Sequence, residues 1–122
     1  MVASGAAKYP NAALIDYGAT KAAMISISKS LARKYGADGV LVNSILPGLI
    51  HTAMWERAAT EIADANDTTM DKVLESNGRS VPVGRYGTSE EVAAVIAFLC
   101  TNAAGYVNGV SMEVDGGSGA HI

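Results

Sequence analysis

The most regular hydrophobic pattern in the chain lies between residues 14 and 35. One face of this segment carries large apolar side chains at helical spacing, namely Met24, Ile27, Leu31 and Tyr35. A second face carries small side chains that suit close approach by another helix, namely Gly18, Ala22, Ser26 and Ser30. Gly36 and the Asp38-Gly39 pair then end the pattern. We therefore expect one long helix from about Leu14 to Tyr35.

Three shorter apolar segments predict strands. Residues 40–46 are nearly continuous in apolar side chains, as in a strand covered on both faces of a parallel sheet, and Pro47-Gly48 ends them. Residues 110–114 alternate apolar and polar side chains, which is typical of a strand with one wetter face. Residues 1–4 form a short apolar end that we interpret as the tail of a further strand.

The second half of the chain predicts further helices. Residues 51–79 are polar and irregular, and we expect two short helices there, broken near Asn66-Asp67, with Thr68 and Asp71 as a capping pair. Thr88 and Glu91 have the spacing of a capping box and open another helix. The apolar face of that helix consists of Val92, Val95, Ile96, Leu99 and Cys100.

The order of these elements predicts the fold class. Strands alternate with helices, which favours an α/β fold with a parallel sheet and right-handed crossovers. No linker, internal repeat or low-complexity tract divides residues 1–122, so we treat them as one unit. Three strands are few for a doubly wound sheet, and the first would leave an uncovered edge that favours association with another chain.

The composition argues against several classes of protein. The net charge is −3, which does not suit a nucleic-acid surface. No apolar run is long enough to span a membrane, and the N-terminus does not resemble a signal peptide. Cys100 is the only cysteine, which fits a reducing cytoplasm. The two histidines, His51 and His121, have no Cys/His cluster around them, so we expect no metal site.

A candidate catalytic trio lies at the start of the long helix. Tyr17 and Lys21 stand four residues apart and so share a helical face, and Ser4 lies thirteen positions upstream. A neighbouring ammonium and a helix N-terminus both favour a phenolate, so such a tyrosine can act as general acid or base toward a carbonyl oxygen. A serine hydroxyl would stabilise charge developing on the same oxygen. Taken alone, the Tyr-x-x-x-Lys spacing fits a surface pair that only supports the helix.

The motifs around the trio favour catalysis. In chain order they are Ser4, Tyr17-x-x-x-Lys21, the Val-Asn-Ser-Ile-Leu-Pro-Gly run at 42–48, Thr52, and the Val-Asp-Gly-Gly run at 114–117. Residues 82–85 (Pro-Val-Gly-Arg) and 90–93 (Glu-Glu-Val-Ala) add two later matches. In this combination the chain resembles the short-chain dehydrogenase/reductase family over essentially its whole length. The resemblance implies the last three strands of a doubly wound, Rossmann-type parallel sheet with flanking helices and a substrate lid.

The resemblance also implies a reaction and its catalytic residues. The cofactor would be NAD or NADP, and the substrate a small-molecule alcohol or ketone. Tyr17 would be the catalytic acid/base. Lys21 would favour the phenolate of Tyr17 and bind the nicotinamide ribose, and Ser4 would orient the substrate oxygen.

Further residues would bind the cofactor. Pro47 and Gly48 would shape the turn beneath the nicotinamide. The backbone of Ile50 would meet the carboxamide, and Thr52 would contact the carboxamide or the pyrophosphate. Residues from about 51 to 80 would form the lid.

Some of these residues also have a purely structural interpretation. Ser4 could only cap a turn, and Thr52 could cap the first lid helix. Met54 and Trp55 could line a substrate pocket or only anchor the lid. We interpret Cys100 as a core residue.

One family feature is missing. Members of the family carry a glycine-rich turn that seats the cofactor pyrophosphate at a helix N-terminus, and nothing upstream of Ser4 matches it. We therefore expect the catalytic and lid half of such an enzyme, whether as a fragment, a gene model begun at an internal Met or a natural truncation. The leading hypothesis is an NAD(P)-dependent oxidoreductase that forms homo-oligomers. The alternative is a catalytically silent half-domain that associates with a partner chain.

Overall fold

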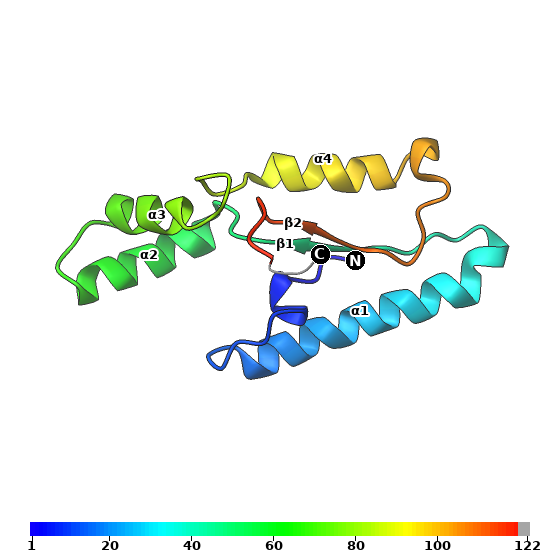
Figure 1. The fold of residues 1–122 in the computed structure, drawn as a ribbon, viewed down its shortest axis with the longest axis horizontal. Coiled ribbons are helices and arrows are strands. Elements are labelled where there is room, and N and C mark those ends of the chain that lie inside the picture. Colours follow the sequence, from blue (N-terminus) through cyan, green and yellow to red (C-terminus); the bar gives the residue numbers. More distant parts are fainter. Residues whose placement is uncertain (120–122) are drawn as a thin grey trace.

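The computed structural model describes residues 1–119, and His121 lies outside this range. The described part is an α/β fold, as the sequence predicts (Figure 1). Its helices and strands are α1 (Ile15–Tyr35), β1 (Ser44–Pro47), α2 (Ala53–Ala65), α3 (Met70–Arg79), α4 (Ser89–Leu99) and β2 (Ser111–Val114). Three short 3-10 turns complete it: η1 (Gly5–Ala7), η2 (Gly36–Asp38) and η3 (Asn102–Ala104).

The sheet is parallel and small. β1 pairs with β2 in a register that runs from Ser44 opposite Ser111 to Pro47 opposite Val114. The N-terminal segment adds a single parallel bridge between Val2 and Ile45 on the other side of β1. The expected third strand is therefore present as one bridge, and the order across the sheet is the N-terminal segment, β1 and then β2.

The buried strand is shorter than the sequence pattern suggests. We expected residues 40–46, but the ladder with β2 begins only at Ser44. Two asparagine side chains take over the backbone hydrogen bonds just before it. The Val42 N–H donates to Asn108 Oδ1 at 2.9 Å, and the Val110 N–H donates to Asn43 Oδ1 at 3.1 Å. The apolar pattern of residues 40–46 does not show that asparagine side chains, rather than a neighbouring strand, accept these backbone hydrogen bonds.

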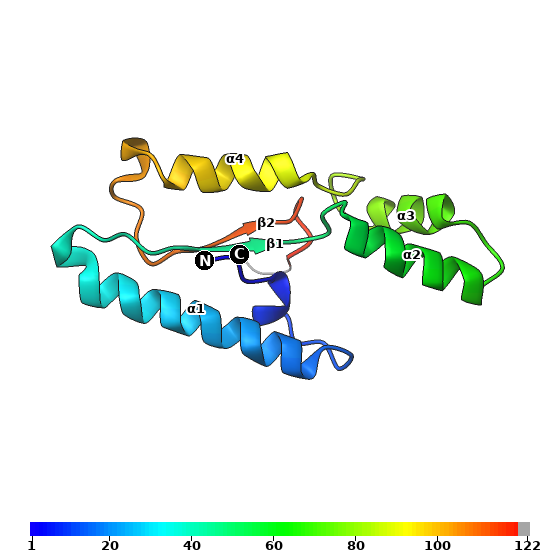
Figure 2. The same ribbon diagram turned by 180° about the vertical axis from the view of Figure 1, so that it is seen from behind.

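Helices cover both faces of the sheet. α1 runs along one face and α4 along the other, which the opposite view shows equally clearly (Figures 1 and 2). At the centre lie Ile45 and Leu46 of β1, both buried. This arrangement buries most of β1, while β2 is half-buried.

The face that α1 buries matches the expected stripe only in part, since Met24 and Leu31 are half-buried. The helix itself is confirmed within one residue, but Ile27 on the predicted stripe is 52% exposed. Ser28 and Ala32 are the buried residues of α1 instead. Their small side chains let the helix backbone come close to the sheet, so the largest apolar side chains do not mark the contact face.

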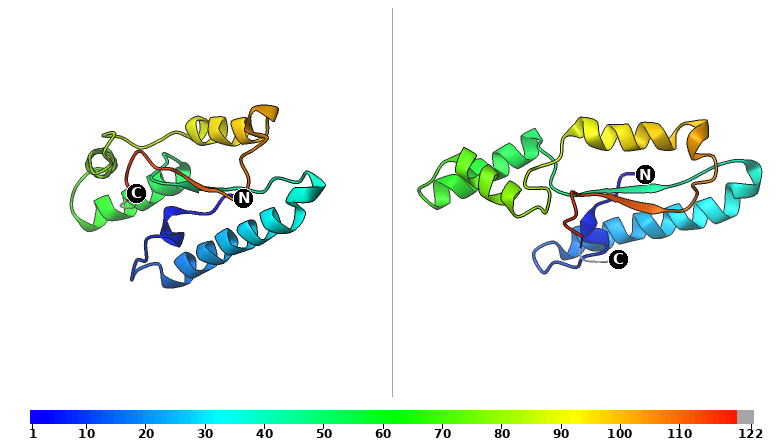
Figure 3. Two further views of the ribbon diagram at one scale, coloured as in Figure 1. Left: turned by 45° about the vertical axis from the view of Figure 1, so that its right-hand side comes forward. Right: turned by 45° about the horizontal axis from the view of Figure 1, so that its top comes forward.

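α2 and α3 form a helical hairpin beyond the carboxyl ends of the strands (Figures 1 and 3). Two helices were expected here, with a break at Asn66-Asp67, and both features are confirmed. The expected cap is wrong by one position. Thr69, not Thr68, precedes α3, and its hydroxyl accepts the Lys72 N–H at 3.4 Å. Thr69 has the extended backbone of an N-cap residue, and a threonine on either side of this boundary gives the same sequence signal.

The two ends of the hairpin are tied together at its base. Ile50, which leads into α2, bridges Gly87, which follows α3. The Gly87 N–H donates to the Leu49 carbonyl and the His51 N–H donates to the Gly87 carbonyl, both at 2.9 Å. The hairpin is thus attached through two chain segments that hydrogen-bond to each other.

The start of α4 follows the sequence prediction and its end does not. The capping box is confirmed, because the Glu91 N–H donates to Thr88 Oγ1 and the Thr88 N–H donates to Glu91 Oε2, at 3.2 and 2.8 Å. Cys100, expected in the core, is exposed. It follows the last residue of α4, where the chain turns away.

No helix among residues 1–119 has both the length and the apolar character that crossing a bilayer requires.

Candidate functional site

The floor of the site is the turn at the carboxyl end of β1. Pro47 is the last residue of β1, and the Gly48 N–H donates to the Val114 carbonyl of β2 at 3.1 Å. A Cβ on Gly48 would lie 2.7 Å from the Cα of Asp115. Glycine is therefore required here, since any larger residue would push the turn away from the end of β2.

Ser4 stands where the N-terminal segment leaves the sheet. It is the N-cap of η1, and its Oγ accepts the Ala6 N–H at 3.2 Å. The structural interpretation of Ser4 as a turn cap therefore holds. A serine hydroxyl has one donor and two acceptor positions, so the cap leaves its O–H free to donate to a ligand.

Tyr17 and Lys21 lie in the first turns of α1. The Lys21 Nζ is 5.5 Å from the centroid of the Tyr17 ring and 3.4 Å from the Val2 carbonyl oxygen, to which it donates. Gly18 brings this part of α1 close to η1, because a Cβ there would lie 3.0 Å from the Ala6 carbonyl. The glycine after Tyr17 thus permits the close packing that sets Tyr17 beside the Ser4 turn.

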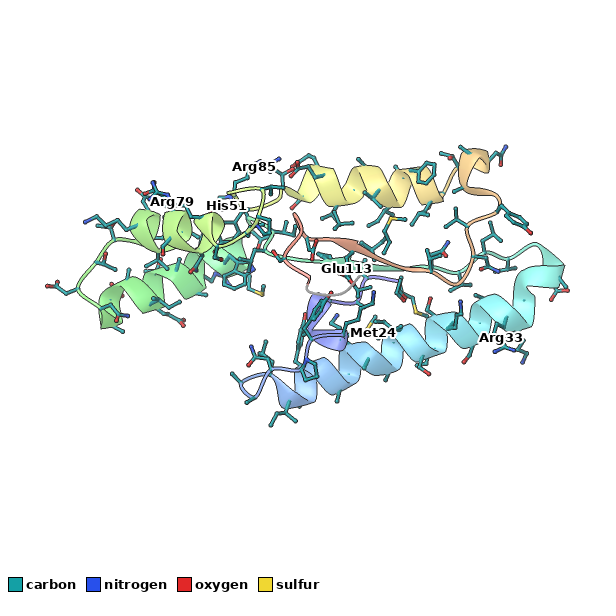
Figure 4. All side chains as sticks on the ribbon, in the orientation of Figure 1. Met24, Arg33, His51, Arg79, Arg85 and Glu113 are labelled. Carbon is teal, nitrogen blue, oxygen red and sulfur yellow. The ribbon has the colours of Figure 1, made fainter. Side chains whose placement is uncertain are left out.

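A second contact fixes the segment after Ser4. The Lys8 Nζ is 2.6 Å from Glu113 Oε1, and the Tyr9 hydroxyl donates to Glu113 Oε2 at 2.9 Å. Glu113 belongs to β2 and lies near the middle of the molecule (Figure 4). The loop that carries Ser4 is therefore held against the sheet from both of its ends.

One cleft of about 620 Å³ brings most of the predicted site together. Six of the seven predicted residues line it: Ser4, Tyr17, Pro47, Gly48, Ile50 and Thr52. Lys21 is not on the cleft wall and lies beside the Tyr17 ring instead. Met54 and Trp55, for which the sequence left two interpretations, both line the cleft.

Thr52 has an unusual environment in this cleft. It occupies the N-cap position of α2, but its side chain makes no capping hydrogen bond. Its Oγ1 is buried and has no hydrogen-bond partner among the described residues. A buried hydroxyl without a partner is costly, so this oxygen is available to a ligand that enters the cleft.

Sequence reasoning missed several lining residues. Leu14 immediately precedes α1, and Ser89 and Val92 lie at the start of α4. Leu14 stands three positions before Tyr17, which is a weak local signal. Nothing local in the sequence connects α4 to the Tyr17 region, because the packing of distant elements brings them together.

The charged groups nearest the lid base are paired with each other. Arg85 Nη1 and Nη2 lie 2.9 and 2.6 Å from the two Glu91 oxygens, and Figure 4 shows Arg85 between the lid and α4. These hydrogen bonds, together with the Thr88 N–H, lower the pKa of Glu91 to about 2. The same pair raises the pKa of Arg85.

Within residues 1–119, no three His, Cys, Asp or Glu side chains gather in a way that would hold a metal ion.

Known proteins resemble the chain over most of its length. Residues 1–119 match a family model described as enoyl-(acyl carrier protein) reductase. The human (3R)-3-hydroxyacyl-CoA dehydrogenase is 35% identical over 116 residues, which are 95% of this chain and 40% of that protein. The 3-oxoacyl-[acyl-carrier-protein] reductase of Aquifex aeolicus is 35% identical over 88% of this chain and 39% of its own length.

The solved structures agree. L-sorbose reductase from Gluconobacter frateurii, complexed with NADPH and L-sorbose, superimposes with a TM-score of 0.94 and 35% identity, over 99% of this chain and 46% of that one. The chain thus spans about 40% of the length of the curated relatives it matches. By the family model, the relatives and the shared fold, the chain belongs to the family of short-chain dehydrogenases and reductases.

Proposed function

We propose that this chain carries the acid–base and lid part of an NAD(P)-dependent oxidoreductase that interconverts an alcohol and a ketone, with Tyr17 as the acid/base. The observation that supports this best is the shared cleft. Ser4 and Tyr17 line the same cavity above the Pro47–Gly48 turn. Lys21 stands beside the Tyr17 ring, at 5.5 Å from its centroid.

The proposed chemistry follows from the free positions of these groups. In ketone reduction the Tyr17 hydroxyl gives its proton to the substrate oxygen while the carbonyl carbon takes up a hydride. The Ser4 O–H, which the Ala6 contact leaves free, donates to the same oxygen and stabilises its developing charge. The Lys21 ammonium stabilises the phenolate that remains on Tyr17. A bound nicotinamide cofactor supplies the hydride and accepts it in the reverse direction.

The cleft fits the nicotinamide end of such a cofactor. The Thr52 Oγ1 is a buried oxygen without a described partner, and a carboxamide N–H would satisfy it. Gly48 keeps the floor flat, since even one added carbon would collide with Asp115. The backbone of Ile50 and the ammonium of Lys21 would hold the carboxamide and the ribose. The L-sorbose reductase that superimposes on this chain was solved with NADPH, which supports the assignment.

Substitution of Tyr17 tests the proposal. The assay follows oxidation of NADPH and NADH, with a panel of ketones, in an intact version that joins this half to a glycine-rich cofactor-binding half, because these residues would hold only one end of the cofactor. Tyr17→Phe removes the proton donor, and turnover should fall by about a hundred- to ten-thousand-fold while cofactor affinity stays similar. Lys21→Ala should lower both turnover and cofactor affinity.

The same helix provides matched controls. Lys34 lies 5.1 Å from the centroid of the Tyr35 ring, so this pair repeats the Lys–Tyr contact away from the cleft. Tyr35→Phe and Lys34→Ala should leave turnover unchanged. Equal turnover of the wild-type chain and Tyr17→Phe would contradict the assignment.

A second candidate is a catalytically silent half-domain that associates with a partner chain. What favours it is a pocket of about 210 Å³ beside the N-terminal segment, which Val2, Leu41 and Leu99 line in part. If the intact version oxidises neither cofactor with any ketone, while the 122-residue chain forms a stable complex with a different chain, this second function replaces the first.

A further inference from the structure

The walls of the 620 Å³ cleft combine a few hydroxyl groups with a larger apolar surface. The apolar part comes mainly from Leu14, Ile50, Met54, Trp55 and Val92. Among the described residues that line the cleft, none carries a charged side chain. A charged or strongly polar substrate would therefore lose its hydration in this cleft without gaining equivalent hydrogen bonds.

We infer that this cleft selects an uncharged, hydrocarbon-rich ketone or secondary alcohol, and that Leu14, Met54 and Trp55 bind its hydrocarbon part. The inference rests on the proposed function for the reacting end of the substrate. It goes further by naming the chemical class of the remainder.

A carboxylate or phosphate on the substrate would find no partner in the cleft. The Lys21 ammonium lies off the wall, and the proposed function assigns it to the Tyr17 phenolate and the cofactor ribose. The first turn of α4 reaches the cleft through Ser89, but the cation nearest to it, Arg85, does not line the cleft and is already paired with Glu91. An ion removed from water without a partner is strongly destabilised, so anionic substrates are disfavoured.

A polyhydroxylated substrate meets a similar limit. The side-chain hydroxyls on the wall belong to Ser4, Tyr17, Thr52 and Ser89. The proposed function uses the first two for the reacting oxygen and Thr52 for the cofactor. Ser89 alone remains, whereas each further substrate hydroxyl that is buried needs its own hydrogen-bond partner.

Two residues of the apolar wall differ in mobility: Trp55 is held by aromatic contacts, whereas Met54 can change its conformation. The Trp55 ring meets the Tyr86 ring edge-on at 5.9 Å, and the His51 ring meets Tyr86 at 6.2 Å. This aromatic cluster sits at the base of the lid, next to the bridge between Ile50 and Gly87. Met54 is 68% exposed, and its unbranched side chain can adjust to different hydrocarbon shapes.

Trp55 is the only tryptophan, so its fluorescence reports directly on the cleft. The 122-residue chain is titrated without cofactor with three probes: 4-tert-butylcyclohexanone, 4-oxocyclohexanecarboxylate and L-sorbose. The carboxylate shares the ring ketone of the first probe but carries a charge, and L-sorbose is the ligand of the structural neighbour. N-acetyltryptophanamide controls for collisional quenching. We expect saturable binding of the hydrocarbon ketone, and at least about tenfold weaker binding of the other two.

A charge placed on the wall should change this selectivity. Met54→Lys should weaken binding of the hydrocarbon ketone and allow binding of the carboxylate, since it supplies the missing cation. Ile62→Lys is the matched control, because Ile62 is exposed on the same helix and does not line the cleft. Ile62→Lys should behave like the wild-type chain.

Each result decides the inference. It is overturned if the carboxylate or L-sorbose binds as tightly as the hydrocarbon ketone, if Met54→Lys behaves like Ile62→Lys, or if no probe gives a saturable signal. Because binding is measured without cofactor or turnover, these outcomes are independent of the Tyr17→Phe assay. Turnover that depends on Tyr17 but prefers a charged or polyhydroxylated ketone would leave the proposed function intact and refute only the substrate class.

Discussion

Some buried hydroxyls without a hydrogen-bond partner belong to residues that line the cleft, and others belong to residues of the packed interior. Four buried hydroxyls lack a hydrogen-bond partner among the described residues: Ser28, Ser44, Thr52 and Tyr86. Thr52 lines the cleft, where the proposed function pairs its Oγ1 with the cofactor carboxamide. Ser28 does not line the cleft, and it lies on the buried face of α1.

Ser28→Ala should therefore stabilise the chain. The Ser28 residue is only 2% exposed, and alanine both removes an unpaired buried hydroxyl and favours the helix. We expect the free energy of unfolding to rise by about 1 kcal/mol, measured by urea denaturation. Ser30→Ala on the same helix is the control, because Ser30 is exposed and its hydroxyl donates to the Ser26 carbonyl at 2.9 Å. A loss of stability in Ser28→Ala would mean that its hydroxyl does have a partner.

At the scale of elements, the segment that follows the lid is joined to α4 by an ion pair. Arg85 follows α3, and Glu91 lies in the first turn of α4, where it also completes the capping box with Thr88. Glu91 is thus held by a guanidinium and a backbone N–H together, which explains why its pKa falls to about 2. The pair fixes the end of the lid relative to the helix that supplies Ser89 to the cleft.

This pair predicts a specific dependence of stability on pH. A carboxylate whose pKa is lower in the folded state stabilises that state above its unfolded pKa, and the contribution disappears as the pH falls through the folded pKa. For Glu91 the window runs from the ordinary value of 4.5 down to about 2. Glu91→Gln keeps the capping-box hydrogen bond but removes the charge. Wild type should be more stable than Glu91→Gln near neutral pH, and the two should converge near pH 2.

Denaturation by urea across this range measures the difference. The pair is exposed to solvent, so high salt should reduce the effect at neutral pH. A stability difference between wild type and Glu91→Gln that stays constant from neutral pH to about pH 2 would contradict the proposed role of the charge.

At the scale of the whole molecule, the sheet edge formed by the N-terminal segment pairs with no further strand among residues 1–119 and carries exposed apolar side chains. Val2 is 49% exposed, and Met1 and Leu41 beside it are exposed as well. Apolar side chains along a strand edge favour pairing with another chain. The cleft begins at Ala3 and Ser4 of the same segment, so this edge lies next to the proposed site.

We therefore expect the 122-residue chain to self-associate and to bind NAD or NADP only weakly. Sedimentation velocity should show a mass that increases with protein concentration, and Val2→Lys should shift the chain toward monomer because edge lysines oppose strand pairing. Ile62→Lys adds the same charge on the lid and should leave association unchanged. A monomeric wild-type chain with micromolar cofactor affinity would contradict both expectations.

The sequence by itself determined the features that depend on neighbouring residues. The extent of α1, the capping box at Thr88 and the break between the lid helices all follow from signals within a few positions. The predicted site residues also came from short motifs, and most of them line one cleft. These features are local because helix geometry and capping act over three or four residues.

Only the tertiary structure decided the rest, because it depends on which elements meet. Ser28 rather than Ile27 is buried in the packed interior. Cys100 is exposed because the chain turns away from the sheet after α4. The apolar wall of the cleft joins Leu14, Trp55 and Val92 from three distant segments. No local pattern encodes such a meeting, because the free energy that fixes it comes from packing between elements far apart in the chain.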